Sequence, residues 1–216
     1  MAKIQRIFFS NWSKAYHNQL RKVVHDIIKK HKSGGKCLDI GCNYSLASEI
    51  LGNDDNYEID AFDIDPAVIS AMKGSYKNVS FFVGDAHDPP PICKKSSYDM
   101  IFAIEIIEHL TNPQFAFKKW CELLKKDGIL ILSTPNAFWF GKRGRGDHIY
   151  HFDLKTLEAM GKENGLDIVE KIGIGIRTFT GSIDTILPIS WIYKFTMPMT
   201  YSFPQFASNI VIIYKK

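Results

Sequence analysis

Two periods of hydrophobic and polar positions follow one another along the chain, and their order predicts the fold. Short apolar runs with period two or with no polar interruption predict strands, and apolar residues spaced three and four apart predict helices. Strands that alternate with helices along the chain are typical of a mostly parallel sheet with helices on both faces. The predicted strands are residues 36–40, 58–63, 79–83, 98–104, 129–133, 166–175 and 207–214, and the predicted helices are residues 13–32, 46–51, 66–73, 113–125 and 153–164.

Cap signals support three of these helices. Asp65-Pro66 and Asn112-Pro113 each join a side chain that can accept from free helical N–H groups to a proline at the first helical position. Asp153 precedes a third apolar helical pattern in the same way. We therefore expect helices to begin at these residues.

The first predicted strand runs directly into Gly41, and Asn43 follows two residues later. Glycine and asparagine tolerate positive φ, so the chain can turn sharply here from strand to helix. Such a turn presents backbone N–H groups to a nucleotide-like ligand. The turn matches neither G-x-G-x-x-G nor the P-loop pattern, so a dinucleotide or a triphosphate is not indicated.

Two acidic residues stand where the next predicted strands end. Asp63 comes about twenty residues after the turn, where a carboxylate can accept from both hydroxyls of a ribose. Asp85 ends the third strand and can accept from an exocyclic amine, while the N–H of Ala86 can donate to a ring nitrogen. Together they predict an adenosine site at the carboxyl edge of the sheet.

These residues resemble class I S-adenosylmethionine-dependent methyltransferases, in which Leu38-Asp39-Ile40-Gly41-Cys42, Asp63, Gly84-Asp85-Ala86 and Tyr98-Asp99-Met100-Ile101 have counterparts in this order. The resemblance covers about residues 36–165. It implies a doubly wound, Rossmann-like sheet of seven strands, mostly parallel with an antiparallel last strand, and S-adenosyl-L-methionine as cofactor. The family's usual G-x-G-x-G reads Gly41-x-Asn43-x-Ser45 here. The cofactor residues that it implies are Asp39, Gly41, Asn43, Asp63, Ile64, Asp85, Ala86 and Ile104.

A hydroxyl acceptor needs alignment with the methyl group and also a base, or a metal that lowers its pKa. Glu105, Glu108 and His109 follow the fourth strand, and a helical turn would place Glu105 and His109 on one face. His148 and His151 lie on a later loop, where they could act on the acceptor or dock the loop on the sheet. The candidate catalytic residues are His148, His151, Glu108 and His109.

A metal is an alternative to a side-chain base, because carboxylates and imidazoles suit Mg²⁺, Mn²⁺ or Zn²⁺. The sequence Glu105-Ile106-Ile107-Glu108-His109 is similar to the motif of small-RNA 3′-terminal 2′-O-methyltransferases and of some quinone-biosynthesis O-methyltransferases. Many metal-free relatives, however, carry Glu-His at this place. We therefore expect no metal, and we expect turnover to survive chelation.

Two segments are rich in aromatic residues. Residues 137–152 combine aromatic, glycine and basic residues, which is typical of a mobile loop that covers a site. Residues 176–206 carry aromatics broken by three prolines and are too discontinuous for a transmembrane helix. The second segment could form a wall of the acceptor site, contact a membrane surface or form a dimer contact.

Composition predicts one domain. The 216 residues with 45% hydrophobic content suit a single methyltransferase domain over residues 1–216. Within it we expect an N-terminal basic helical segment (1–35), a cofactor-binding core (36–134), an acceptor-site loop, helix and cap (135–206) and a last strand (207–216). The four cysteines have neither C-x-x-C nor metal spacing, which is typical of a reduced, cytoplasmic protein.

Charge adds little about partners. The net charge is +4, but residues 1–35 hold eight Lys and Arg against Asp26 alone. A solvated helix face is the favoured interpretation, and a weak membrane-surface contact is the alternative. No stacking platform interleaved with basic residues is visible, so a nucleic-acid partner is not favoured. We expect a small-molecule acceptor and either a monomer or a homodimer.

The sequence thus predicts methyl transfer from S-adenosylmethionine to a hydroxyl of a small molecule, either a quinone-like lipid or a sugar. One alternative is an RNA ribose 2′-O-methyltransferase that uses a divalent metal, because of the basic first helix and the Glu-x-x-Glu-His motif. The other alternative is a non-catalytic cofactor-binding or interaction module, because Asn43 and Ser45 stand where glycines are usual.

Overall fold

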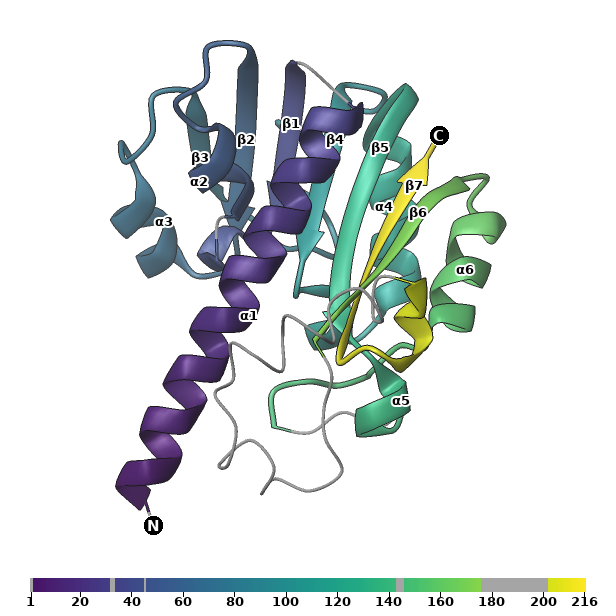
Figure 1. Cartoon of the computed structure of the whole chain (residues 1–216). Helices are drawn as coiled ribbons and strands as arrows, with labels where there is room; N and C mark the ends of the chain where they lie inside the picture. The colour runs from purple at the N-terminus through teal and green to yellow at the C-terminus, as the bar shows by residue number, and fades with distance from the viewer. Residues whose placement is uncertain (1, 32–33, 45, 143–145, 176–201) are drawn as a thin grey trace.

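The computed structural model describes residues 2–31, 34–44, 46–142, 146–175 and 202–216, with side chains from Tyr16 onward except those of Tyr44 and Phe140. Its described part contains one seven-stranded sheet in the order β3-β2-β1-β4-β5-β7-β6 (Figure 1). Strand β7 is antiparallel to both of its neighbours, whereas β1 to β5 pair in parallel. The predicted fold class, including the antiparallel last strand, is confirmed.

The strands lie close to their predicted positions, with one exception. Strand β5 begins at Leu124, so the prediction that a helix reaches Lys125 is wrong. Leu124 already pairs with Tyr98 of β4, and Asp127 takes a positive φ of 62° where the ladder is irregular. The strands are β1 (Gly35–Ile40), β2 (Tyr57–Asp63), β3 (Val79–Val83), β4 (Tyr98–Ile104), β5 (Leu124–Pro135), β6 (Asp167–Ile174) and β7 (Asn209–Lys215).

The three predicted helix caps are confirmed. The side chain of Asp65 accepts from the N–H of Ala67 at 2.8 Å, and those of Asn112 and Asp153 cap their helices in the same way. The helices are α1 (Ala2–His31), α2 (Leu46–Leu51), α3 (Pro66–Met72), α4 (Pro113–Leu123), α5 (Ala137–Phe140) and α6 (Leu154–Glu163).

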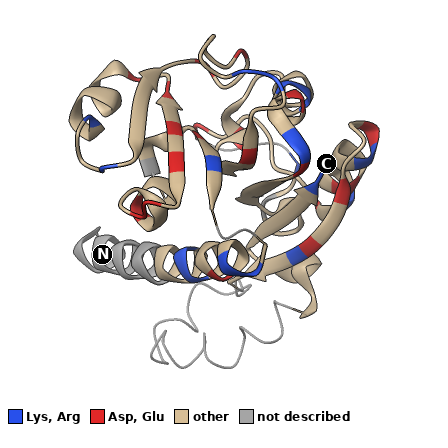
Figure 2. Ribbon diagram, turned by 90° about the horizontal axis from the view of Figure 1, so that it is seen from above, with Lys and Arg blue, Asp and Glu red and all other residues tan. Residues whose placement is uncertain are grey.

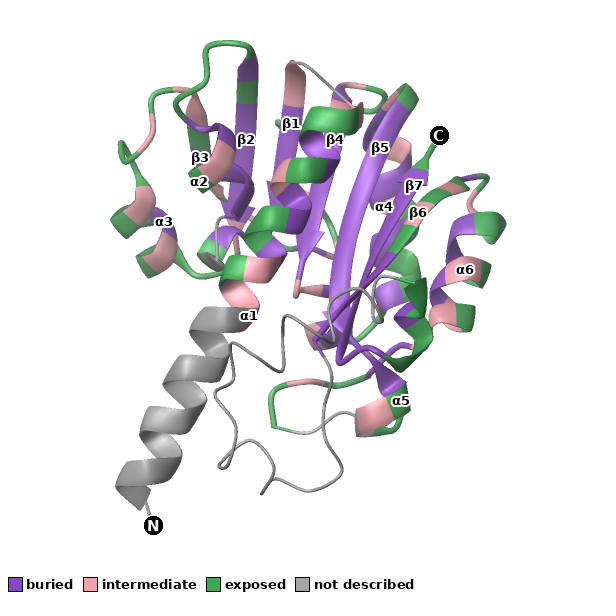
Figure 3. Cartoon of the chain, viewed as in Figure 1, coloured by how far each residue is buried: buried purple, intermediate pink, exposed green. Residues whose placement is uncertain are grey.

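The described helices cover both faces of the sheet. Helices α1, α2 and α3 pack on one face, and α4 and α6 pack on the other (Figure 1). The central strand β4 is buried along nearly its whole length, as its continuous apolar run predicts (Figure 3). The sheet is therefore a rigid support on which the ends of neighbouring strands are held in fixed relative positions.

Helix α1 is longer than its sequence pattern indicates. It begins at Ala2 rather than at Ser13, since residues 2–12 hold no glycine or proline that would stop it. The predicted apolar face is confirmed in the described half of the helix. The buried residues of that face are Leu20, Val23, Val24, Ile27 and Ile28.

The basic residues of α1 that the structure describes lie on its outer side (Figure 2). Arg21 forms an ion pair with Glu49 at 2.8 Å, and Lys30 forms one with Glu170 at the same distance. These contacts are consistent with a solvated helix face whose charges are partly paired. None of the helices in the described ranges is long and apolar enough to cross a membrane.

The aromatic segment 137–152 is only partly a loop. It begins with α5 and returns to the sheet edge at Phe152, which forms a bridge with Asn136. Residues 143–145 lie outside the described part of the chain. Residues 176–201 do so as well, and with them most of the segment for which three roles were considered.

Candidate active site

The turn after β1 is held by the N–H of Gly41, which donates to the carbonyl of Phe62 at 2.9 Å. Glycine is required here for two reasons, and the first is its φ of +70°. A Cβ at this position would lie 2.8 Å from Cδ1 of Ile106. Any side chain here would therefore strain the backbone and displace Ile106.

Asp63, at the end of β2, joins two turns and keeps capacity for a ligand. One carboxylate oxygen accepts from the N–H of Asn43 at 3.1 Å, and the other accepts from the N–H of Asp65 at 3.0 Å. Each carboxylate oxygen has a second lone pair. The side chain is half-buried at the carboxyl edge, so these lone pairs can still accept from ribose hydroxyls.

A cavity of about 210 Å³ lies beside these turns. Its volume is below the roughly 300–1,000 Å³ of pockets that hold drug-sized ligands, so it fits a nucleoside better than a whole cofactor. The lining combines apolar residues such as Ile64, Ile106 and Leu110 with polar ones. Its lining residues are Gly41, Phe62, Asp63, Ile64, Gly84, Asp85, Ala86, His87, Ile106, His109 and Leu110.

The cavity thus brings together most of the predicted cofactor residues, but three lie elsewhere. Asp39 is buried, and its carboxylate accepts from the Ser48 hydroxyl at 3.1 Å, so it holds the start of α2 in place. Asn43 contributes its N–H to Asp63 instead of lining the cavity. Ile104 is buried at the end of β4.

His87 was missed by the sequence analysis, although it lines the cavity beside Asp85. Oδ1 of Asp85 accepts from the His87 N–H at 2.8 Å and lies 2.9 Å from Nδ1 of the His87 ring. Two hydrogen bonds lower the pKa of Asp85, and the one from the His87 backbone has a larger effect than the one from the His87 ring. Desolvation opposes them but does not outweigh them. The spacing Asp-x-His directly after a strand end was the available signal.

Glu105 and His109 do not share a helical face, so that prediction is wrong. The helical turn begins only at Ile107, and Glu105 precedes it with a φ of +52°, which is rare for a residue with a side chain. The Glu105 carboxylate accepts from the Ser133 hydroxyl at 2.7 Å and from the Asn209 amide at 3.0 Å. Glu105 is therefore tied to strands β5 and β7.

Glu108 is completely buried and only partly satisfied. One carboxylate oxygen accepts from the hydroxyl of Thr134 at 3.0 Å, while the other has no hydrogen-bond partner within the described chain. Burial raises the pKa of Glu108 well above its usual value, and the nearby charge of Glu105 raises it further. A proton or a metal ion would satisfy the open oxygen.

Three histidines form a chain beside Glu108. The rings of His109 and His148 lie edge to face with centroids 4.8 Å apart. Nδ1 of His148 lies 3.1 Å from Nε2 of His151, and Nδ1 of His151 lies 3.0 Å from the carbonyl oxygen of Gly141. Because a carbonyl only accepts, His151 carries its proton on Nδ1. When His151 is neutral, its Nε2 accepts from Nδ1–H of His148.

This tautomer assignment leaves Nε2 of neutral His148 with a free lone pair. Nδ1 of His109 lies 3.1 Å from the carbonyl oxygen of Asp147, so the same reasoning leaves Nε2 of neutral His109 unprotonated. Glu108, His109 and His148 each bring a ligand atom to one place, where these atoms lie within 4.8 Å of one another. This group, the Glu108–His109–His148 cluster, can hold a proton or a divalent cation.

An apolar surface adjoins the histidines. Phe138 and Phe206 are 54% and 47% exposed, and their rings meet at 5.3 Å. The Trp139 indole N–H donates to the carbonyl of Phe206 at 2.7 Å. Helix α5 ends at Phe140, and the carbonyl of the next residue, Gly141, contacts His151, so the helix that carries Phe138 is linked to the chain of histidines.

The sequence matches a family model and is similar to curated proteins. A family model described as a methyltransferase domain matches residues 12–171. The ubiquinone biosynthesis O-methyltransferase of Pelagibacter ubique is 27% identical over 211 residues, a match that covers 82% of each chain. The protein of the same name from Nitrosospira multiformis is 26% identical over 172 residues, which cover 68% of this chain and 69% of that one.

A solved structure has a similar fold. The S-adenosylmethionine-dependent methyltransferase from Archaeoglobus fulgidus gives a TM-score of 0.63 at 14% identity, with 91% of this chain and 94% of that chain covered. The family match includes every residue of the cavity and of the Glu108–His109–His148 cluster. The chain therefore belongs to the class I S-adenosylmethionine-dependent methyltransferases and is an enzyme of that family.

Proposed function

We propose that this methyltransferase acts on a hydroxyl group of a small, hydrophobic molecule, such as a quinone-like lipid. The observation that carries the proposal is that the Glu108–His109–His148 cluster shares His109 with the cofactor cavity and is linked through His151 to Gly141, the residue after the helix that carries the exposed ring of Phe138. The names of the ubiquinone-biosynthesis relatives also support it. A sugar acceptor is less well supported, because the adjoining surface is aromatic and apolar.

S-adenosylmethionine supplies an electrophilic methyl group, and this chain's residues hold it and orient the acceptor. Asp63 and Asp85 take the ribose and the adenine, and the backbone at Gly41 allows a close approach. Alignment of the acceptor with the methyl group supplies most of the rate. The apolar rings would exclude water from the acceptor oxygen.

His148 is the proposed general base. Its free Nε2 can take the proton of the acceptor hydroxyl, and His151 fixes its tautomer from the other side. Burial, with the neighbouring His109 adding to it, lowers the pKa of His148, which keeps its ring neutral near pH 7. His151 is buried and acts through His148, so it is a positioning residue.

A metal-assisted form of the same reaction is the second candidate. The open oxygen of Glu108 and the three converging ligand atoms favour it. Carboxylate and imidazole ligands would suit Mn²⁺, Mg²⁺ or Zn²⁺. A bound cation would lower the pKa of the acceptor hydroxyl, and His148 would then act as a ligand instead of a base.

The test compares His148→Ala and His151→Ala in methyl transfer to a catechol that carries a short prenyl chain. Loss of the base should lower kcat for His148→Ala by roughly 10²-fold or more, while the affinity for S-adenosylhomocysteine stays unchanged. His151→Ala should cost less, since it loosens the tautomer without removing the base. The matched control is His25→Ala, at a half-exposed histidine of α1.

Chelation separates the two candidates. We expect turnover by protein treated exhaustively with EDTA to equal that of untreated protein. Loss of activity that Mn²⁺ or Mg²⁺ restores would establish the metal-assisted form. A few-fold change or less on His148→Ala, together with resistance to EDTA, would contradict both and leave alignment as the only contribution.

A further inference from the structure

His87 connects two segments that lie far apart in the sequence. On one side, its backbone N–H and its ring nitrogen Nδ1 lie 2.8 and 2.9 Å from Oδ1 of Asp85. On the other side, Nε2 lies 3.3 Å from the backbone nitrogen of Asn112 and 3.2 Å from the Thr111 hydroxyl. Asn112 caps α4, so His87 ties the loop after β3 to the start of a helix.

These contacts determine where the proton of the His87 ring is. A backbone N–H only donates, so Nε2 of His87 must accept from Asn112. The ring is then neutral with its proton on Nδ1, which donates to Asp85. Neither contact would survive a ring flip, because the flip would place carbon atoms opposite the carboxylate and the amide.

The His87 contacts fix the orientation of the Asp85 carboxylate, which could otherwise rotate. Half of its side chain is exposed, so packing alone does not hold the carboxylate in one orientation. The two donors of His87 occupy Oδ1 and leave Oδ2 as the oxygen available to a ligand. The next residue is also fixed, since the Trp120 indole N–H donates to the carbonyl of Ala86 at 2.8 Å.

We propose that His87 is a positioning residue for the nucleobase: it holds Asp85 so that one carboxylate oxygen accepts from a 6-amino group of a purine. The proposal rests on the assignment of Asp85 to the adenine. A carboxylate only accepts, so it favours an amine and repels the carbonyl oxygen of a 6-oxo purine. A carboxylate that rotates freely discriminates less, because it can turn away from the carbonyl oxygen.

The experiment measures the affinities of S-adenosylhomocysteine and S-inosylhomocysteine by calorimetry. The second ligand has a carbonyl oxygen in place of the amine and is otherwise the same. We expect the wild-type protein to prefer the adenine ligand by about 30-fold, the range that a hydrogen bond to a charged group supplies. In His87→Ala the preference should fall to about threefold or less, mainly through weaker binding of S-adenosylhomocysteine.

Two further variants separate orientation from general damage. His87→Asn places an amide N–H close to the position of Nδ1 and should keep the preference at about tenfold or more, although it loses the contact with Asn112. His25→Ala removes a half-exposed histidine of α1 and should bind both ligands as the wild type does. Equal weakening of both ligands in His87→Ala, with the preference kept, would overturn the proposal.

Asp85→Asn distinguishes a failure of this proposal from a failure of the cofactor assignment. Its amide can donate to a carbonyl, so the preference for the adenine ligand should disappear. If Asp85→Asn keeps the preference, the assignment of Asp85 to the adenine is wrong. If Asp85→Asn loses it and His87→Ala keeps it, only the role of His87 is wrong.

The tautomer gives an independent measurement. Long-range ¹H–¹⁵N correlation spectra of the wild-type protein should show a neutral His87 ring protonated on Nδ1 at pH 7.5, with Nε2 unprotonated. A ring protonated on Nε2, or on both nitrogens, would contradict the hydrogen bonds on which the proposal depends.

Discussion

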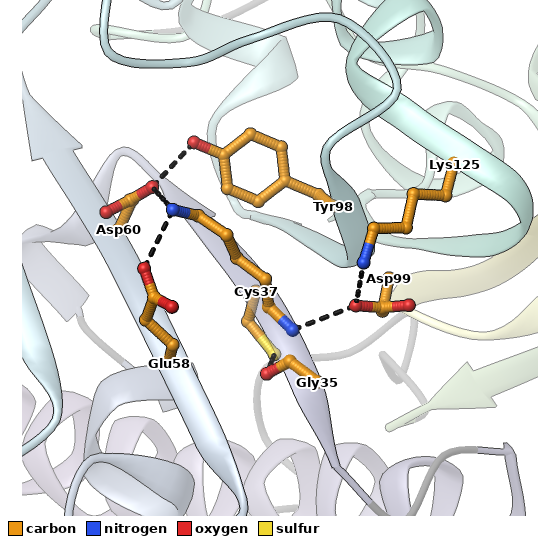
Figure 4. Close-up of polar contacts among 8 residues, drawn as sticks. Gly35, Cys37, Glu58, Asp60, Tyr98, Asp99 and Lys125 are labelled. Carbon is orange, nitrogen blue, oxygen red and sulfur yellow. Dashed lines mark hydrogen bonds and ion pairs between the residues drawn. The ribbon is translucent and has the colours of Figure 1, made fainter.

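Acidic side chains are buried near both ends of the parallel strands, which are called here the amino edge and the carboxyl edge of the sheet. The two edges differ in whether these acids have a cationic partner. On the amino side, Asp60 in the middle of β2 is 4% exposed and accepts from the hydroxyl of Tyr98, the first residue of β4, at 2.7 Å (Figure 4). The Lys36 ammonium lies 3.0 Å from Asp60 and 2.8 Å from Glu58. This buried charge is therefore both neutralised and hydrogen-bonded.

Asp99 at the same edge is paired as fully. Its carboxylate accepts from the backbone N–H of Lys36 at 2.9 Å and from the Lys125 ammonium at 2.7 Å (Figure 4). Gly35 allows this approach, because a Cβ there would lie 2.6 Å from Oδ2 of Asp99. Gly35 also has a φ of +123°, so only glycine suits this position.

At the carboxyl edge, Glu105 and Glu108 have no Lys or Arg partner in the part of the chain that the structure describes. Desolvation by burial raises the pKa of both. A protein that only needed stability would pair these acids, as it does at the other edge, or replace them by apolar residues. The difference teaches that the paired acids of the amino edge belong to the scaffold, whereas the open oxygen of Glu108 marks a place that a proton, a cation or a substrate can complete.

Removal of the cation at the amino edge should have the largest effect. Lys36→Met would leave the buried Asp60 with the Tyr98 hydroxyl as its remaining partner among the described residues. Loss of one partner of a buried pair typically costs about 3 kcal/mol. Urea denaturation should show this loss in the free energy of unfolding. Lys77→Met, which breaks the exposed pair with Asp55, is the matched control and should leave stability unchanged. Equal stability of both variants would contradict the comparison.

Glu108→Gln should have an intermediate effect of opposite sign. Because burial raises the pKa of Glu108, the folded protein holds a proton there that the unfolded chain releases above about pH 4.5. The contribution of this proton to the free energy of unfolding is therefore complete below about pH 4.5 and is lost as the pH rises toward the raised pKa of Glu108. Glutamine cannot ionise, so the variant should be more stable at pH 8 by about 1–2 kcal/mol.

The measurement for Glu108→Gln is the free energy of unfolding between pH 4.5 and 8. The wild type should lose stability more steeply than the variant across this range. Glu170→Gln, at an acid paired with Lys30, is the control and should not gain stability at pH 8. Parallel pH profiles for wild type and Glu108→Gln would show that Glu108 is ionised as easily as an exposed acid.

Lys125→Met should have the smallest effect. Lys125 is 43% exposed, and Asp99 keeps its hydrogen bond from the Lys36 backbone after the change. Solvent screens such a pair, so we expect a loss of about 0.5 kcal/mol. A loss as large as that of Lys36→Met would show that the two pairs act as one network, which a double-mutant cycle would measure.

Local signals predicted most of the scaffold. Strand β4, helix α2 and the caps at Asp65, Asn112 and Asp153 depend on residues close in sequence, and they lie where the pattern indicates. The start of β5 was missed, because Leu124 belongs to a strand only through its pairing with Tyr98 of β4. Apolar periodicity contains no information about such a partner.

The site was predicted in composition but not in arrangement. The cavity gathers Gly41, Asp63 and Asp85 because parallel strands end at one edge, a rule that sequence order already carries. The positive φ of Glu105 separates it from His109, and no local pattern indicates that value. His87 was missed for a similar reason, since its second partner, Asn112, lies 25 residues away.

The position of β7 affects the order in which the chain can fold. This strand lies between β5 and β6, yet it follows both in the chain, and more than seventy residues separate Pro135 from its partner Asn209. During synthesis, the long apolar edge of β5 stays open until residues 209–215 have left the ribosome, and β6 has no neighbouring strand until then. Such an open edge invites pairing with other chains. Pairing of strands so far apart in the sequence is also slow, so nascent chains of this protein should depend on chaperones until β7 inserts.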